Sequence, residues 1–206
     1  MVDSEALISL GSSTLYEAAG CPCALDHQIR TVWPGAAVAG PAFPLRCPPN
    51  DNLGIHLALE RAPRGSILVV DAAGHAGGYW GEVLTVAAEA RGIAGLVIDG
   101  GVRDIAAMTR RRFPAFARTV SVRGTIKATA PSVGEPTVVA GVLVSPGDWI
   151  VADDDGVVCL PAGRVAEIVA AGQARADKEA AMMERLVAGE TTVEILGLTA
   201  ARAKLG

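Results

Sequence analysis

The segment 66–104 constrains the fold more than any other part of the chain, because short apolar runs alternate in it with glycine-rich loops. β-Branched residues dominate 66–70 and 96–98, as is typical of buried strands. Between them, apolar residues recur at helical spacing over 82–91 and stop at Gly92, a typical helix C-cap. This strand, loop, helix, strand order favours parallel pairing, with the loops after both strands at one sheet edge. The sequence therefore predicts an α/β fold with a βαβ core.

Charged residues stand where these loops would meet. Glu82 lies at the predicted helix start, and Arg103 and Asp104 follow a double glycine that we expect to turn the end of the second strand. The free amides of Val83 and Leu84 would lie beside them. Two carboxylates, an arginine and free amides suit a small anionic substrate bound together with Mg²⁺ or Mn²⁺. Arg-Asp pairs near strand ends are also commonly structural, so spacing alone leaves both interpretations open.

The composition fits a soluble protein with one sizeable core. Of 206 residues, 50% are hydrophobic and 4% aromatic, so we expect a single domain over 1–206. The net charge of -4 argues against nucleic-acid binding, which needs a basic face. No segment reaches membrane-spanning length, and the N-terminus lacks the basic and apolar regions of a signal peptide. We therefore expect a cytoplasmic protein without membrane or nucleic-acid partners.

The four cysteines do not form a recognisable zinc motif. Cys21 and Cys23 are too closely spaced for the usual zinc knuckle, and no second cysteine or histidine pair completes a site. Reduced thiols are the expected state in the cytoplasm. The acidic run 153–155 lacks the spaced ligands of an EF-hand loop, so it indicates a hairpin turn rather than a calcium site.

Two histidines near the central unit have different expected roles. His56 lies in an apparent helix over 52–61, where a structural role is expected. His75 lies in the glycine-rich loop before Glu82. For His75, lining the site and packing the loop both remain open.

Periodicity and turn residues outline the remaining elements. The expected elements are a helix capped by Ser12 or Ser13 and ended by Gly20, a strand with proline at its edges over 34–44, a helix over 105–112, strands over 115–117, 137–144, 149–152 and 156–160, and a C-terminal helix over 163–188 followed by a tail over 191–206.

The central motifs resemble a known family. Trp-Gly-Glu-Val-Leu at 80–84 and Gly-Gly-Val-Arg-Asp at 100–104 are similar to the acid, twenty residues, Arg-Asp signature of class II pyruvate aldolases. Those enzymes cleave 4-hydroxy-4-methyl-2-oxoglutarate and 4-carboxy-4-hydroxy-2-oxoadipate, and RraA, a regulator of ribonuclease E, shares their fold. Similar blocks lie at 34–42, 47–52, 123–125 and 146–156, and the resemblance as a whole extends over nearly the whole chain. The resemblance implies a single RraA-like domain of layered sheet and helices.

The resemblance also implies roles for the motif residues. Asp104 would be the direct protein ligand of Mg²⁺ or Mn²⁺, with water at most other positions. Arg103 would hold the keto-acid oxygens, and the amides of Val83 and Leu84 would receive the pyruvate carboxylate. Glu82 stands where these aldolases often have aspartate, and its extra methylene moves the carboxylate outward. We expect it to orient a water as acid or base.

Family members complete their site with a C-terminal glutamate from a neighbouring subunit of a trimer. In this sequence Glu179 is the best match and Glu184 is the reserve. The apolar residues of the C-terminal helix and tail also favour association. We therefore expect a homo-oligomer, either a trimer or a hexamer built from two trimers.

The function implied is that of a lyase. The bound cation and Arg103 would stabilise the enolate formed when a 4-hydroxy-2-oxo acid is cleaved to pyruvate, and the same electron sink would decarboxylate oxaloacetate. A Schiff-base lysine is not needed for this chemistry. Two alternatives stay open: an RraA-like regulatory protein that binds an RNA-degrading enzyme, and an enzyme of another reaction type that handles sugars or keto acids.

Overall fold

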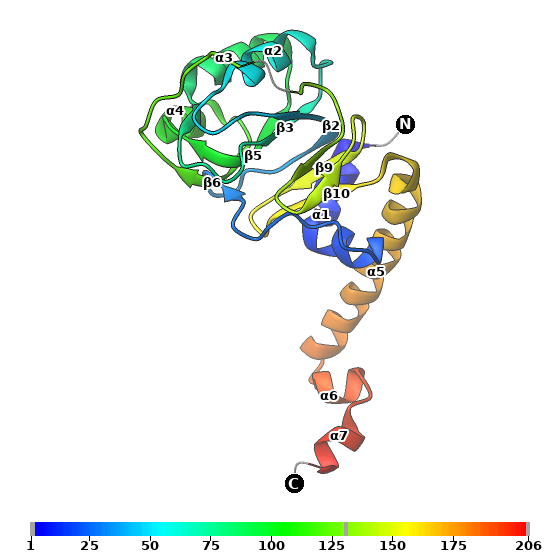
Figure 1. Ribbon diagram of the computed structural model, residues 1–206. Coiled ribbons are helices and arrows are strands. Elements are labelled where there is room, and N and C mark those ends of the chain that lie inside the picture. Colours follow the sequence, from blue (N-terminus) through cyan, green and yellow to red (C-terminus); the bar gives the residue numbers. More distant parts are fainter. Residues whose placement is uncertain (1–2, 130–131, 205–206) are drawn as a thin grey trace.

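The computed structural model describes residues 3–129 and 132–204, and its centre is an eight-stranded mixed sheet (Figure 1). The strand order is β1-β6-β5-β3-β2-β9-β10, and β4 pairs with β5 beside this path. Neighbours from β6 to β2 are parallel, whereas β1, β9 and β10 join antiparallel. The bounds are β1 Arg30–Thr31, β2 Val38–Arg46, β3 Ile67–Asp71, β4 Gly78–Trp80, β5 Gly95–Val102, β6 Ala115–Val120, β9 Trp149–Ala152 and β10 Val157–Leu160.

Helices cover the sheet in two groups. The helices α2, α3 and α4 lie together over the parallel strands, while α1 and α5 pack on each other beside β9 and β10 (Figure 1). Each group of helices packs on a separate cluster of buried apolar side chains, and a third cluster lies among the strands. The bounds are α1 Ser4–Ala19, α2 Leu53–Arg61, α3 Glu82–Arg91, α4 Ile105–Arg111, the 3-10 turn Ala162–Arg164, α5 Val165–Val187, α6 Thr192–Ile195 and α7 Thr199–Lys204.

The predicted βαβ core is confirmed. The strands β3 and β5 pair in parallel, with Ile67 opposite Gly95, and α3 lies between them in sequence. Helix α3 ends at Gly92, whose φ of 73° is the left-handed conformation that glycine adopts without a Cβ penalty. The loops after β3 and β5 therefore open at one edge of the sheet.

The predicted turn at the double glycine is wrong. Gly100 and Gly101 lie inside β5, which continues to Val102 and pairs there with β4. A Cβ at Gly101 would collide with the carbonyl oxygen of Gly77, which directly precedes β4. Glycine at this position therefore allows β4 to lie close to β5. The glycines thus serve strand packing at the site edge.

The strand predictions around β2 and residues 137–144 also need correction. The strand β2 runs from 38 to 46 in the middle of the sheet and carries Pro41 and Pro44 inside it. It changes partner between these prolines, from β9 to β3. Residues 137–144 form a hairpin of β7, Thr137–Val139, and β8, Val142–Val144. Ala140 and Gly141 make the turn, with φ values of 48° and 89°.

The first helix begins earlier than predicted. Asp3 caps α1, and a bend at Gly11, with φ of 77°, separates its first turns from the segment that ends at Gly20. Ser12 follows the bend, but its hydroxyl donates to Asp153. In the same way, the hydroxyl of Ser13 on α1 donates to Asp155, which lies in the turn between β9 and β10. These bonds fasten α1 to the turn between β9 and β10.

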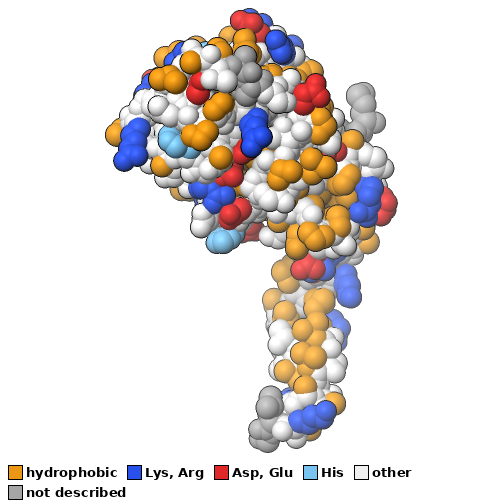
Figure 2. Space-filling model, in the orientation of Figure 1, with side chains coloured by type: hydrophobic (Ala, Val, Ile, Leu, Met, Phe, Trp, Pro, Cys, Tyr) orange, Lys and Arg blue, Asp and Glu red, His pale blue; other side chains and the backbone are white. Residues whose placement is uncertain are grey.

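The end of the chain stands away from the rest. No residue from Gln173 to Lys204 is buried, and Figures 1 and 2 show this segment, here called the C-terminal arm, projecting from the body. Several large apolar side chains on the arm are exposed: Met183, Val187, Leu196 and Leu198. Among the described residues, no helix has the length and apolarity needed to cross a bilayer.

Candidate active site

Arg103 and Asp104 meet the start of α3 at one pocket. Asp104 is the N-cap residue of α4, with φ of 59°, a left-handed conformation that aspartate adopts more readily than most residues. Its Oδ2 accepts a hydrogen bond from the backbone amide of Glu82 at 3.0 Å. Nε of Arg103 lies 3.8 Å from the same oxygen. The structure thus brings together the two charged segments, the start of α3 and the Arg103-Asp104 pair, that the sequence places at this sheet edge.

Gly81 makes this close approach possible. Its backbone is extended, with φ of -162° and ψ of -166°, which any residue could adopt. A Cβ at this position would, however, collide with Oδ2 of Asp104 and come within 3.1 Å of Cγ of Arg103. The requirement for glycine here is therefore one of space.

The first turn of α3 leaves two backbone amides without a helical acceptor. The amide of Thr85 donates to the carbonyl of Gly81 at 3.0 Å, which is the first bond of the helix. The amides of Val83 and Leu84 precede it and have no carbonyl four residues earlier inside the helix. Both residues line the pocket. This end of the pocket therefore attracts anions.

The pocket has a volume of about 240 Å³ and two chemically different ends. One end carries the charged pair and the free amides, and the other is built from α2 and a segment that follows β6. The lining residues are Asn52, His56, Gly78, Tyr79, Gly81, Val83, Leu84, Arg103, Asp104, Gly124, Thr125 and Lys127.

The second end, which we call the far wall, comprises Asn52, His56 and Lys127. The expectation of a merely structural His56 was incomplete, because this residue lines the pocket. The buried Oδ1 of Asn52 and Nε2 of His56 have no hydrogen-bond partner among the described residues. Burial, and then the charge of Lys127, lower the pKa of His56. The far wall therefore contributes a cation to the pocket lining, and two of its polar atoms are buried without a partner among the described residues.

The Glu82 carboxylate points away from the pocket. Its Oε1 lies 3.3 Å from Nε of Arg111 on α4, and Nη1 of Arg111 binds Glu89 at 2.9 Å. Glu82 is not among the lining residues, although its backbone amide holds Asp104. The predicted acid and base role of Glu82 stays a prediction, and it requires the side chain to leave Arg111 or to act through water.

The two candidate glutamates lie on α5, far along the chain from the pocket. Glu179 accepts from Arg175 at 2.9 Å, and Arg175 also lies 3.5 Å from Glu17 on α1. Glu184 is exposed. Neither lines the pocket of its own chain. Their predicted role concerns a neighbouring subunit and stays a prediction.

His75 packs the glycine-rich loop rather than lining the pocket. Its Nδ1 lies 3.1 Å from the hydroxyl of Tyr79. That hydroxyl donates to the carbonyl of Pro48 at 3.1 Å and accepts from the amide of Asn50 at 2.7 Å. The network ties the loop before α2 to β4, which forms the floor of the pocket.

The donor set at Asp104 fits a hard divalent cation. The carboxylate of Asp104 is 44% exposed and faces the pocket. Within residues 3–129 and 132–204, no group of three His, Cys, Asp or Glu side chains could hold a metal. Mg²⁺ commonly takes one or two carboxylates and keeps several waters. Asp104 with water therefore fits Mg²⁺ or Mn²⁺ better than a structural zinc ion.

The acidic run 153–155 forms the hairpin turn that the sequence predicts. Asp153 and Asp155 hold α1, and Asp154 accepts from the amide of Gly35 at 3.0 Å. These residues form the turn between β9 and β10, as predicted. All four cysteines carry free thiols.

Comparison with known proteins places this chain in a family. The RraA-like family model, described as Aldolase/RraA, matches residues 12–159. A Halalkalibacterium halodurans protein, provisionally named a 4-hydroxy-4-methyl-2-oxoglutarate aldolase, is 35% identical over 158 residues, 76% of this chain and 75% of its own. A Burkholderia multivorans protein with the same provisional name is 37% identical over 146 residues, 68% and 86% of the two chains.

A solved structure extends the comparison to a protein described as an inhibitor family member. Streptomyces coelicolor RraAS2, described as an unusual member of the RNase ES inhibitor RraA family, superposes with a TM-score of 0.78 at 28% identity. The alignment covers 88% of this chain and 96% of that one. The fold, the sequence relatives and the matched family model agree, and this chain belongs to the RraA-like aldolase/RraA family.

Proposed function

We propose that this chain is a class II aldolase that uses a divalent metal to cleave 4-hydroxy-2-oxo acids to pyruvate, with oxaloacetate decarboxylation as a side activity. The observation that carries the proposal is the meeting of Arg103, Asp104 and the free amides of Val83 and Leu84 at one pocket. The provisional names of the aldolase relatives support the same reaction class.

The carboxylate and the keto oxygen of a 2-oxo acid each have a partner in this arrangement. The amides of Val83 and Leu84 suit the carboxylate, and the guanidinium of Arg103 suits the keto oxygen. Negative charge grows on that oxygen as the C3–C4 bond breaks, so the hydrogen bonds from Arg103 strengthen in the transition state. Mg²⁺ or Mn²⁺ held by Asp104 would add electrophilic polarisation of the 2-oxo acid.

The far wall is proposed to receive the part of the substrate beyond C3. Lys127 suits an anionic substituent, and Asn52 and His56 present buried polar atoms that a polar substrate group would satisfy. A substrate with a second carboxylate therefore matches the pocket at both ends.

The active unit is proposed to be a homotrimer or a hexamer in which a neighbour's Glu179 or Glu184 completes the site. Two observations support this: the Glu82 carboxylate is engaged by Arg111, and the large apolar side chains of the arm are exposed among the residues that the structure describes. A shared site would use the arm of one subunit at the pocket of the next.

Pyruvate release tests the proposed reaction. Purified protein is given 4-hydroxy-4-methyl-2-oxoglutarate or oxaloacetate with Mg²⁺, with Mn²⁺ or with EDTA. We expect turnover with either cation and none in EDTA, because one carboxylate gives only modest metal affinity. Because Lys127 lines the pocket, borohydride is added with pyruvate as a control. An unchanged protein mass would agree with metal chemistry, whereas a reduced adduct on Lys127 would replace it with a Schiff-base mechanism.

The superposition on an RNase ES inhibitor family member supports a second candidate, a regulatory protein that binds an RNA-degrading enzyme. The two candidates make opposite predictions. A regulator would slow RNA cleavage by a ribonuclease E-type enzyme and would release no pyruvate from either substrate. The net charge of -4 favours contact with a basic protein surface over contact with RNA itself.

A further inference from the structure

A pair of thiols lies outside the pocket, where α1 ends. Cys21 and Cys23 flank Pro22 directly after Gly20, the left-handed C-cap of α1. Cys21 is partly exposed and lines a surface depression of about 300 Å³ at the end of α1. A small oxidant in solution can therefore reach the Cys21 thiol.

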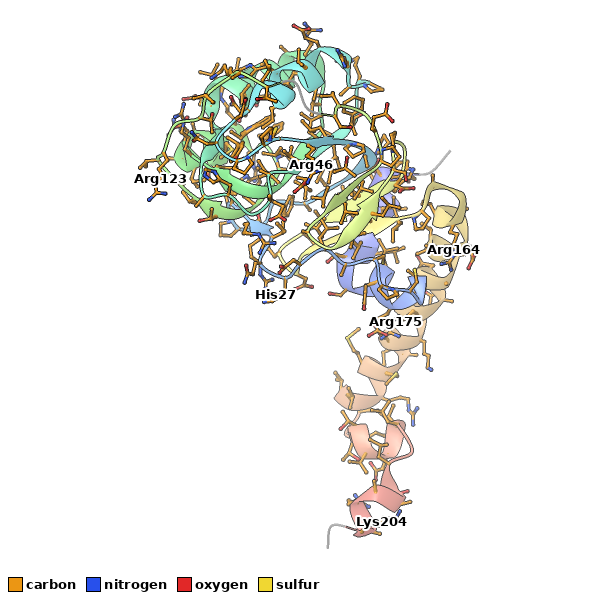
Figure 3. All side chains as sticks on the ribbon, in the orientation of Figure 1. His27, Arg46, Arg123, Arg164, Arg175 and Lys204 are labelled. Atoms are coloured by element: carbon orange, nitrogen blue, oxygen red, sulfur yellow. The ribbon has the colours of Figure 1, made fainter. Side chains whose placement is uncertain are left out.

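A fixed cation lies beside this thiol. Nη1 of Arg164 is 3.6 Å from Sγ of Cys21. Nη2 of the same guanidinium donates to the carbonyl of Ala19 at 3.2 Å and to Glu167 at 3.0 Å, so two hydrogen bonds hold the group in place. Figure 3 shows Arg164 where α5 begins, beside the end of α1. The guanidinium of Arg164 is therefore the fixed cationic neighbour of the Cys21 sulfur.

Cys23 is placed to react second. Cys23 is 3% exposed and lies two residues after Cys21. Burial, and then the electrostatic effect of Cys21, raise the pKa of Cys23 to about 11. Its backbone carbonyl accepts from the amide of Cys159 at 2.8 Å, which fixes the residue against β10. The buried thiol therefore keeps its proton and is shielded from solution while Cys21 is reduced.

We propose that Cys21 and Cys23 form a modification site at which a peroxide converts two thiols into one disulfide. In the first step the Cys21 sulfur attacks the peroxide, the O–O bond breaks, and the products are a Cys21 sulfenic acid and water. In the second step the Cys23 sulfur displaces the hydroxyl of the sulfenic acid, and a second water leaves with the Cys23 proton. Two thiols are oxidised and one hydrogen peroxide is reduced to two waters.

The other two thiols provide internal controls. Cys47 and Cys159 are 2% and 4% exposed, and burial raises the pKa of each to about 12. Neither lines the depression at the end of α1. Both should react with peroxide much more slowly than Cys21, because they are buried and held as thiols.

The test is peptide mapping of the reduced, full-length protein after treatment with hydrogen peroxide and alkylation of the remaining thiols. Trypsin keeps Cys21 and Cys23 in one peptide, 1–30, because no lysine or arginine precedes Arg30. We expect peptide 1–30 to lose two hydrogens when its disulfide forms. Its thiols should become unavailable to the alkylating reagent on the order of tenfold faster than those of Cys47 and Cys159. Equal rates for all four thiols, or a Cys23–Cys159 disulfide, would overturn the proposal.

Variants separate the two steps. Cys23→Ser should stop at the Cys21 sulfenic acid, which dimedone traps, and Cys21→Ser should leave Cys23 reduced. Arg164→Gln should slow oxidation of Cys21, whereas the matched variant Arg175→Gln should not, since Arg175 bridges α5 to Glu17 without touching a thiol. Thermal unfolding of each variant checks that the protein is folded. Unchanged oxidation in folded Arg164→Gln, or disulfide formation in Cys23→Ser within one chain, would contradict the mechanism.

Discussion

The body of the molecule and its C-terminal arm differ in where their side chains find partners. In the body, strands such as β3 and β5 bury every residue, and the pocket is built from segments that hydrogen-bond to each other. In the arm, no described residue is buried, and the apolar side chains of Met183 and Val187 face solvent. The difference indicates that contacts within the body are sufficient to bury its apolar side chains. The apolar side chains of the arm could be buried only against another surface.

The largest effect is expected at the metal ligand of the body. Asp104→Asn keeps the size, and asparagine also tolerates the left-handed backbone at this position. It removes the negative charge that would hold the cation. We therefore expect a loss of at least about 3 kcal/mol in transition-state stabilisation, measured from kcat/KM for pyruvate release. Asp154→Asn, in the exposed turn between β9 and β10, is the matched control. Activity near that of the control variant would show that Asp104 holds no metal.

A somewhat smaller loss is expected for Arg103→Lys. Lysine keeps the charge but loses the planar fork that can donate to two oxygens. We expect a loss of about 2–4 kcal/mol in transition-state stabilisation, measured as kcat/KM, by comparison with removal of one oxyanion donor. A near-normal kcat/KM would make Arg103 a structural partner of Asp104, since the two groups already lie 3.8 Å apart.

Stability measurements compare the two regions directly. Ile98 is fully buried in β5, whereas Leu198 on the arm is 47% exposed. We expect Ile98→Ala to lower the free energy of unfolding by about 2–5 kcal/mol, because it leaves a cavity in the core. Leu198→Ala should change the unfolding of an isolated subunit by less than about 0.5 kcal/mol, but it should weaken association in sedimentation experiments. Equal destabilisation by both changes would mean that the arm folds against its own body.

The smallest effect concerns pH. Burial and Lys127 lower the pKa of His56, so the unfolded chain binds a proton more readily than the folded one. The stability contributed by neutral His56 is complete above its unfolded pKa of about 6.5 and is lost as the pH falls toward the lower folded pKa. Urea unfolding of His56→Gln should therefore lose less stability between neutral and mildly acidic pH than the original protein. An identical pH dependence would show that His56 is not the responsible group.

Local patterns were sufficient for the central unit. The β-branched runs, the helical periodicity and Gly92 correctly predicted β3, α3 and β5, and the edge at which Arg103 and Asp104 lie. The double glycine was misread because its role depends on a distant segment: β4 packs so closely that a Cβ at Gly101 would meet Gly77. Such an approach leaves no signal in the neighbouring sequence.

The far wall could not be predicted for a similar reason. Asn52 and Lys127 are far apart in sequence, and they are brought together by backbone pairing of the two segments. The amide of Ile126 donates to the carbonyl of Asn50 at 2.9 Å, and the amide of Asn52 donates to the carbonyl of Ile126 at 3.0 Å. The only sequence signal was that Asn52 lies in one block of family resemblance, 47–52, and Lys127 lies just after another, 123–125.

The side-chain direction of Glu82 was equally inaccessible, because helix position fixes its backbone but not its ion pair. Arg111 lies 29 residues later and reaches Glu82 only because α3 and α4 pack together. This contact holds the Glu82 carboxylate outside the pocket lining, which is why we propose that a neighbouring subunit supplies an acid.

Reconstitution of mixed oligomers tests most directly whether the body of one subunit and the arm of another form one active site. The Arg103→Ala variant lacks the guanidinium proposed to bind the substrate. It is denatured, mixed with Glu179→Ala and refolded, and pyruvate release is measured. Each variant refolded alone should be inactive. The mixture should regain activity, because some interfaces pair an intact Arg103 with an intact Glu179 from the adjacent chain. Full activity of Glu179→Ala alone, or an inactive mixture from correctly assembled oligomers, would contradict the shared site.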